Sequence, residues 1–420
     1  MQRLRQQDKK QRMKGSNSKQ NKSVNLRLVL SQVVTHRPVS RADIARATHL
    51  TKQTITNLID ELLATQLVIE SGIKKEKVGK PSTMLMLNTE LCFSLAIRVF
   101  PHQVEVALCQ LDGTVLGNIR QPAHSEQAET VQQLATELLA QHQINRHQLL
   151  GAGLTLVQFG DVAVEQRQQQ NQLLQQQLIG LLQLPVAIEH TAAACAAYHL
   201  LHGEAKLLDS FCYIHLGQQL DAALVYDRKL LLGHNGLTGA LGEIFVTPDL
   251  DEKTTELGRL NDYASVASLT NFIRKKQPQL QTQSLLTINA ESAGDKLDPW
   301  FALSTEPMRI AIHTLESIFN CQTIIIGGEV SSWFLDKLIS RLRPFIPSVA
   351  QFGKREVPRL IKTPDVELIA LKGLGTLPLH AAIRLDATNT IGLPPVSALT
   401  PLQQLIFNDP DQGSATIDED

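Results

Sequence analysis

Two short helices joined by a tight turn most constrain how the N-terminal part of this chain can fold. They lie in the stretch "SRADIARATHLTKQTITNLIDELLATQLV", from Ser40 to Val68. Ser40 and Asp43 have the Ser-x-x-acid form of a helix N-cap and predict a helix to about Ala47, and Thr51 caps the next helix. The second helix has apolar residues spaced to form one buried face: Ile55, Leu58, Ile59, Leu62 and Leu63. The stretch predicts a helix-turn-helix.

The flanking residues complete a small domain. An earlier helix is predicted from four apolar residues at helical spacing: Leu26, Val29, Leu30 and Val33. After this helix-turn-helix, the sequence reads as a β-hairpin, with a strand at Val68–Ile69, a basic loop from Lys74 to Lys80 and a strand at Thr83–Leu87. Three helices followed by a basic-tipped hairpin predict a winged helix-turn-helix over residues 23–88.

The polar face of the second helix is unevenly charged. Its front half carries no acid, whereas Asp60 and Glu61 stand at the back. Gln and Asn side chains pair with adenine, Lys with guanine, and Thr with the thymine methyl group or a phosphate, when the front of a helix enters the major groove. We therefore predict that this domain binds DNA. The predicted contacts are Arg41, Thr51, Lys52, Gln53, Thr54, Thr56, Asn57 and, in the wing, Lys80.

The distribution of charge agrees with this prediction. Residues 1–80 hold 17 of the 40 Lys and Arg residues and 6 of the 41 Asp and Glu residues, which leaves 23 and 35 for the remainder. A basic N-terminal part joined to an acidic body is typical of a protein with a nucleic-acid-binding domain, although a solvated basic tail would produce part of the same pattern. Residues 1–22 contain almost nothing to bury and are predicted to be a disordered basic arm.

From Leu91 onward the pattern changes to apolar strands, short turns and helices. Two strand-rich units, each followed by helices, predict an α/β body of two related lobes over residues 89–205 and 206–385, the second ending in a helix that returns to the first lobe. The segment "VELIAL" is predicted to be a late strand and "TLPLHAAIRL" the last helix. Residues 386–420 form a C-terminal extension with an acidic, disordered end.

The cysteines and the hydropathy restrict the class of protein further. The five cysteines are widely spaced without a CxxC pair, which argues against a zinc or disulfide framework and favours buried free thiols in a reducing cytoplasm. No apolar run approaches the roughly 18 residues of a membrane span, and no N-terminal signal peptide is apparent. These features predict a soluble cytoplasmic protein.

The order of these segments resembles the ROK family, which groups sugar-responsive transcriptional repressors with sugar kinases. The resemblance covers about residues 24–385 and rests on the helix-turn-helix, the wing "GKPSTMLMLN", "GHNGLTGALGE" and "TIIIGGEVS". It implies an N-terminal winged helix-turn-helix followed by a two-lobed, actin-like (RNase H-like) ROK body. The presence of both the helix-turn-helix and the wing, which together form an N-terminal head (residues 23–88), favours the repressor branch.

Two kinase features of the family are missing. A glycine-rich turn should follow the first strand of the body, because backbone N–H groups must approach phosphate oxygens closely. This chain has "RVFPHQ" there, without glycine or acid. The family's catalytic aspartate is replaced in "AIEHTAAAC" by His190 and Thr191. The resemblance thus implies a protein that is not an enzyme, and Gly327-Gly328, which would face a nucleotide in the kinases, is predicted to form a tight strand-to-helix turn.

The zinc and sugar motif is also incomplete. Where the family has Gly-Glu-x-Gly-His, this chain reads "GEIFV", and no cysteine cluster follows. We therefore predict that no metal and no cofactor is bound. The resemblance leaves Asn235 and Glu243 as partners for sugar hydroxyl groups, although "GHNGLTGALGE" also suits a purely structural glycine-rich loop.

Together these features predict a cytoplasmic DNA-binding regulator, a repressor of carbohydrate-related genes. It would bind a double-stranded, pseudo-palindromic operator as a homodimer or homotetramer, with a non-catalytic body for oligomerisation and for sensing a sugar, a sugar phosphate or a protein inducer. One alternative is a regulator whose body binds a partner protein rather than a sugar. Another is a ROK sugar kinase with an appended head.

Overall fold

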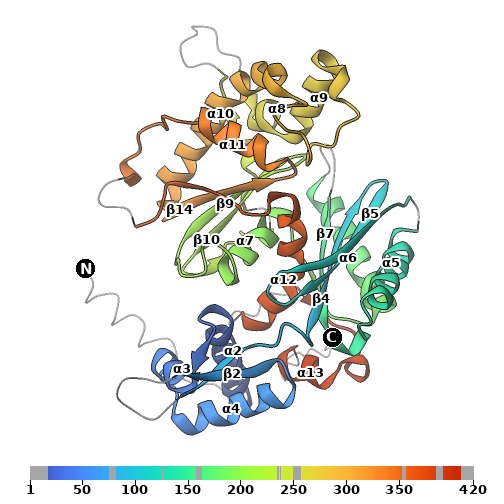
Figure 1. Cartoon of the computed structure of the whole chain (residues 1–420), viewed down its shortest axis with the longest axis vertical. Helices are drawn as coiled ribbons and strands as arrows, with labels where there is room; N and C mark the ends of the chain where they lie inside the picture. The colour runs from blue at the N-terminus through green and yellow to red at the C-terminus, as the bar shows by residue number, and fades with distance from the viewer. Residues whose placement is uncertain are drawn as a thin grey trace, which may run out of the picture.

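The fold was analysed in a computed structural model of the chain. The structure describes residues 18–74, 82–124, 126–157, 163–233, 236, 238–248, 257–351, 356–384 and 391–407. Two predicted site residues, Lys80 and Asn235, lie outside these residues, as do residues 1–17 of the predicted arm and the acidic end from residue 408. The N-terminal head lies below a body of two lobes, with α7 and α12 between the lobes (Figure 1).

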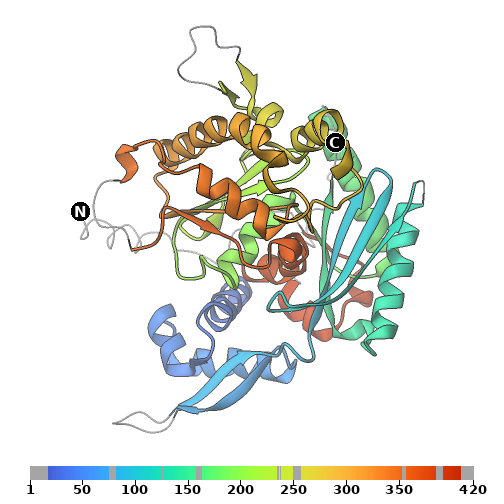
Figure 2. The ribbon, with the colours of Figure 1, turned by 45° about the horizontal axis from the view of Figure 1, so that its top comes forward.

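The head contains three helices and a three-stranded sheet of order β1-β3-β2. Val39 pairs with Leu85 of β3, a pairing that the sequence analysis did not predict. The hairpin of β2 and β3 extends away from both lobes (Figure 2). The first helix begins at Ser18, so the prediction of a disordered arm up to residue 22 is wrong for its last five residues. The elements are α2 (Ser18–Thr35), β1 (Val39–Ser40), α3 (Arg41–Thr48), α4 (Lys52–Ala64), β2 (Val68–Lys74) and β3 (Ser82–Leu87).

Lobe 1 is built on a six-stranded sheet of order β16-β8-β7-β4-β5-β6. Strands β4, β5 and β6 form an antiparallel meander. Helices α5 and α6 cover one face of the sheet, and α7 and α12 pack on the other. The elements are β4 (Phe93–Phe100), β5 (Gln103–Gln110), β6 (Val115–Pro122), α5 (Gln127–Gln141), β7 (Leu149–Leu156), α6 (Val164–Leu182), β8 (Val186–Ile188), α7 (Thr191–Leu201), α12 (Ile369–Ile383) and β16 (Ile391–Gly392).

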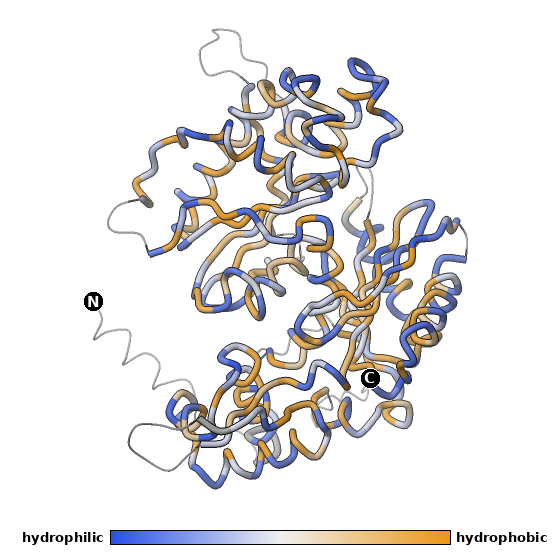
Figure 3. Tube along the Cα trace, in the orientation of Figure 1, coloured by the Kyte–Doolittle hydropathy of each residue, from blue (hydrophilic) through white to orange (hydrophobic). Residues whose placement is uncertain are grey.

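Lobe 2 has a five-stranded sheet of order β11-β10-β9-β14-β15. Its inner face packs on α7 and its outer face on α8 to α11, and the central strands of both lobes are predominantly hydrophobic (Figure 3). The elements are β9 (Phe211–Leu216), β10 (Leu220–Tyr226), β11 (Lys229–Leu230), β12 (Phe245–Val246), β13 (Gly258–Arg259), α8 (Leu260–Ala264), α9 (Val266–Lys276), α10 (Asp298–Phe319), β14 (Thr323–Gly328), α11 (Ser332–Arg341) and β15 (Leu360–Lys362).

The prediction of a strand at "VELIAL" is wrong, because Val366–Leu368 forms a 3-10 turn that leads into α12. A continuous apolar run does not distinguish a buried strand from a buried helix. The segment Val366–Ile383 is long and apolar enough to span a membrane, but 78% of it is buried inside the protein, as in a core helix. After it, β16 pairs with β8, and α13 (Pro401–Phe407) packs near α2.

Helices α7 and α12 approach each other closely in the body. Five small residues of α7, from Ala192 to Ala196, are buried. A Cβ atom on Gly373 of α12 would lie 2.6 Å from the backbone of Ala194 and Cys195. The two helices are therefore in backbone contact, which only small side chains permit.

We expect Gly373→Ala to destabilise the protein by about 1–3 kcal/mol, because the added methyl group would meet backbone atoms that cannot move away. Gly180→Ala is the matched control, since this helical glycine of α6 has no atom within 4 Å of its Cβ position. There the change should stabilise the protein by about 0.4–1 kcal/mol. Chemical denaturation of both variants checks the prediction, and equal midpoints would contradict it.

Candidate functional site

The helix-turn-helix is held by the two caps that the sequence predicts. Ser40 Oγ accepts a hydrogen bond from the Asp43 backbone N–H at 3.2 Å, and its own hydroxyl donates to the Asp43 carboxylate at 2.7 Å. Thr51 Oγ1 accepts from the Thr54 N–H at 3.2 Å. Because Ile44 of α3 and the apolar stripe of α4 are buried, α4 can only present its polar face to solvent.

The exposed front of α4 brings together six of the predicted site residues. Lys52, Gln53, Thr56 and Asn57 are exposed, and Thr54 is half-buried beside Thr51. Gln53 Nε2 donates to Asn57 Oδ1 at 3.0 Å, so the two amides form an ordered pair one helical turn apart. This pair still offers the Gln53 carbonyl oxygen and the Asn57 amide protons to a base edge.

Arg41, the first residue of α3, contacts acidic residues of the head. Its guanidinium forms ion pairs with Asp60 of α4 at 3.4 Å and Glu70 of β2 at 3.3 Å. Glu61 is paired with Lys22 of α2 at 2.8 Å. Both acids at the back of α4 are thus partly neutralised from within the head, and a phosphate would have to compete with two carboxylates for Arg41.

Glu243 lies in lobe 2 at the edge of a pocket of about 570 Å³. Its carboxylate accepts a hydrogen bond from Asn261 at 3.0 Å and pairs with Arg259 at 3.4 Å. Apart from Ala267, the rest of the lining is also polar and includes Gln218, Asp262, Ser265, Ser268, Asn271 and Lys275. Such a mixture of amide, hydroxyl and charged groups suits a polyhydroxylated molecule. Among the described residues, no group of three or more His, Cys, Asp or Glu side chains could hold a metal ion. All five cysteines are buried free thiols, as the sequence predicts.

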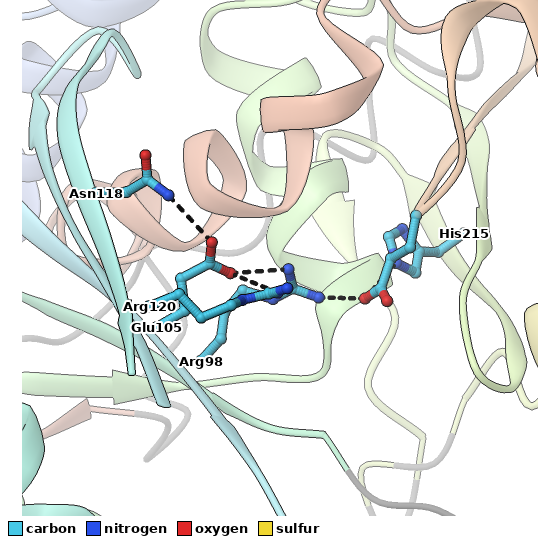
Figure 4. Close-up of polar contacts among 6 residues, drawn as sticks. Arg98, Glu105, Asn118, Arg120 and His215 are labelled. Carbon is cyan, nitrogen blue, oxygen red and sulfur yellow. Dashed lines mark hydrogen bonds and ion pairs between the residues drawn. The ribbon is translucent and has the colours of Figure 1, made fainter. Parts of the chain in front are cut away.

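A buried charge network joins the two lobes (Figure 4). In lobe 1, Glu105 accepts from Arg98 at 3.1 Å, from Arg120 at 3.1 Å and from Asn118 at 3.2 Å. Arg98 also pairs with Glu329, which follows β14 of lobe 2. This network was not predicted from the sequence. Its signal was the presence of Arg98 and Glu105 inside otherwise apolar strands, since buried charges are almost always paired.

The network also includes His215 of β9, whose Nε2 lies 3.8 Å from Glu329. Burial raises the pKa of Glu329, but Arg98 and His215 outweigh it and lower the value to about 2. Burial lowers the pKa of His215, but Cys195 and Glu329 outweigh it and raise the value to about 9. Glu329 is therefore ionised and His215 protonated at neutral pH, and each stabilises the other.

This protonation predicts a loss of stability at alkaline pH. Because the pKa of His215 is raised on folding, its contribution is complete below the unfolded value of about 6.5 and is lost as pH rises through 9. We expect a decrease of about 1–3 kcal/mol in the free energy of unfolding between pH 6.5 and 9.5. Denaturation of the wild type and of His215→Gln at a series of pH values checks this prediction. In the variant, the free energy of unfolding should decrease less steeply as the pH rises. An unchanged slope would contradict the prediction.

The structure describes the residues at the positions to which the resemblance assigns kinase chemistry. His190 is the N-cap residue of α7, but its side chain makes no capping hydrogen bond. Burial lowers its pKa, as do His215 and Arg167, while Asp221 opposes them. Gly327 and Gly328 are the last residues of β14 and not the turn that was predicted. A Cβ atom on Gly328 would lie 2.6 Å from Leu216 Cβ, so strand packing requires glycine there.

Comparison with known proteins gives consistent results. A family model described as the ROK family matches residues 94–367. The xylose repressor of Caldicellulosiruptor bescii is 25% identical over 371 residues, which cover 81% of this chain and 92% of that protein. The xylose repressor of Bacillus subtilis is 23% identical over 279 residues, which cover 64% of this chain and 72% of that protein. A crystal structure of a ROK family transcriptional regulator, a homologue of the E. coli MLC protein, has a TM-score of 0.62 at 21% identity and covers 86% of this chain and 97% of that one. This structural likeness shows a shared fold.

Proposed function

Because this chain belongs to the ROK family, we propose that it is a sugar-responsive transcriptional repressor that acts on carbohydrate-related genes in the cytoplasm. Two of its relatives are named xylose repressors. The head binds a two-fold symmetric operator, the body joins two or four copies, and a ligand of the body changes the affinity of the head for DNA. The symmetry of such an operator follows from the symmetry of the oligomer.

The observation that carries this proposal is the acid-free, exposed front of α4. Gln53 and Asn57 offer amide groups to adenine, and Lys52 offers an ammonium group to guanine. The N–H groups at the start of α4 attract phosphate, as helix N-termini do. Lys80 in the wing would add a contact to the neighbouring minor groove, while Arg41 would contribute only after it leaves Asp60 or Glu70.

The body in this proposal is non-catalytic. Arg98 comes from the segment that replaces the phosphate-binding turn, and Glu329 directly follows Gly327-Gly328. Their ion pair joins the two segments that would otherwise face a nucleotide. A phosphate placed there would meet the Glu329 carboxylate and would have to displace two acids from Arg98, which makes nucleotide binding unfavourable.

The ligand in this proposal is a sugar bound near Glu243, with Asn235 as a second partner. Glu243, Asn261 and Arg259 supply acceptors and donors at fixed positions. A sugar shifts the repressor only if it binds the DNA-competent and DNA-incompetent arrangements unequally. In this proposal, a free pentose or hexose binds the DNA-incompetent arrangement more tightly and therefore lowers the affinity of the repressor for its operator.

The test is the selection of genomic fragments bound by the purified full-length protein at near-physiological salt. We expect enrichment of a two-fold symmetric site, and xylose, glucose and N-acetylglucosamine are then titrated into the complex. Binding that is only salt-sensitive and independent of sequence would overturn the proposal. If a symmetric site is found but no sugar changes the affinity for it, the ligand of the body would be a partner protein and not a sugar. If the protein turns over ATP with any of these sugars, the body would be a kinase.

A further inference from the structure

The C-terminal end of α7 is in direct contact with the head. Arg37, between α2 and β1, lies with its guanidinium nitrogen 3.1 Å from Nδ1 of His202, the C-cap residue of α7. A guanidinium can only donate, so His202 Nδ1 accepts and its proton is on Nε2. Burial and the charge of Arg37 lower the pKa of His202 to about 3, which keeps the ring neutral and able to accept.

The opposite end of α7 lies among the ionisable groups of the body. His190 at the N-cap interacts with Asp221 and His215 of lobe 2. Between the two ends, His199 Nδ1 accepts from the Glu204 N–H at 3.3 Å, so Nε2 carries the proton and donates to Thr363 at 3.0 Å.

Ring contacts connect the middle of α7 to the charge network between the lobes. The ring of His199 stacks on Tyr213 with 5.4 Å between centroids. Tyr213 is 6.2 Å from the ring of His215, which pairs with Glu329. One continuous series of contacts thus leads from Arg98 and Glu329 to the head.

Close packing makes α7 a rigid element. All its residues from Ala192 to Ala197 are buried, and its backbone touches α12 at Gly373. Packed helices of this kind shift as bodies and do not deform locally. A second contact between head and body does not involve α7: Arg27 of α2 donates to the backbone carbonyl of Arg384 at 3.1 Å.

We infer that α7 transmits the state of the interlobe charge network to the DNA-binding head through the Arg37–His202 contact. Separation of the lobes breaks the Arg98–Glu329 pair, which spans them, and the accompanying shift of α7 moves the segment that connects α2 to α3. The inference concerns the regulation of the site described above and rests on the proposed function for its biological role, but the mechanical coupling can be measured without DNA.

The experiment is a double-mutant cycle in the full-length protein. Glu329→Gln weakens the interlobe pair, Arg37→Met removes the contact of α7 with the head, and Arg27→Met is the matched control. The readouts are hydrogen exchange of the α3 and α4 amides and the affinity for the selected operator. We expect Glu329→Gln to change the exchange or the affinity about fivefold or more, within the range of allosteric couplings. This change should disappear in the Arg37→Met background and persist with Arg27→Met.

The inference is overturned if Glu329→Gln leaves the head unchanged or if its effect survives Arg37→Met. Should Glu329→Gln fail to fold, as judged by circular dichroism, Asp221→Asn beside His190 replaces it in the same cycle. If the wild-type protein binds no specific operator, the proposed function fails, while hydrogen exchange in the head still decides whether α7 couples the two parts.

Discussion

Simultaneous replacement of Lys52, Gln53 and Asn57 by alanine is expected to abolish sequence-specific DNA binding while leaving the fold intact. All three side chains are exposed on the front of α4, so their removal creates no cavity. A good bidentate contact to a base contributes about 1–3 kcal/mol of discrimination. The loss of two or more such contacts should weaken binding to the selected operator about 100-fold or more.

The measurement is an operator titration by fluorescence anisotropy at several salt concentrations. Removal of the positive charge of Lys52 from the DNA-facing surface should also reduce the salt dependence, by at most about one unit of slope. The matched control carries three alanines on the exposed face of α5 in place of Gln133, Thr136 and Glu137. That variant should bind like the wild type. Equal affinities for the two triple variants would mean that α4 does not read the operator.

The largest effect on stability is expected for Arg98→Ala. This change leaves the largely buried Glu329, whose side chain is 19% exposed, with His215 as its remaining charged partner among the described residues, while Glu105 keeps Arg120. Removal of one partner from a buried ion pair costs about 3–5 kcal/mol. For a protein of this size the melting temperature should fall by about 3–6 °C.

Differential scanning calorimetry of Arg98→Ala beside Arg120→Ala checks this prediction. Arg120 shares the partner Glu105 but has a side chain that is 40% exposed, so its loss should cost no more than about 1 kcal/mol. The double change Arg98→Met and Glu329→Leu should recover much of the lost stability, because apolar side chains can replace a buried ion pair. Arg98→Ala and Arg120→Ala variants of equal stability would show that the interlobe pair contributes little.

Much of the fold could be predicted because its signals are local. The caps at Ser40 and Thr51 and the helical spacing from Ile55 to Leu63 lie within one or two turns of the residues they organise. The strands of the meander from Phe93 to Pro122 are separated by Pro101-His102 and Asp112-Gly113, which are turn signals. Such elements depend little on distant parts of the chain.

The predictions from the sequence fail or are incomplete where contacts between distant parts of the chain determine the local structure. The helical conformation of the "VELIAL" segment depends on the packing of α12 between the two sheets, and the short strand Val39–Ser40 exists only because β3 lies beside it. The ion pairs of Arg41 with Asp60 and Glu70 could likewise not be predicted, because only the folding of the head brings these acids together. Neither hydrophobic period nor turn chemistry contains this information.

The sequence by itself determined the helix-turn-helix and which side chains of α4 face solvent, because helical period and capping act over a few residues. Only the tertiary structure decided that Arg98 and Glu329, separated by 231 positions, form an ion pair between the lobes. It also placed α7 so that His199 stacks on Tyr213 beside this network and the C-terminal end of the helix meets Arg37 of the head. The partner of a buried charge is chosen by how whole sheets and helices pack, and that choice is a property of the assembled chain.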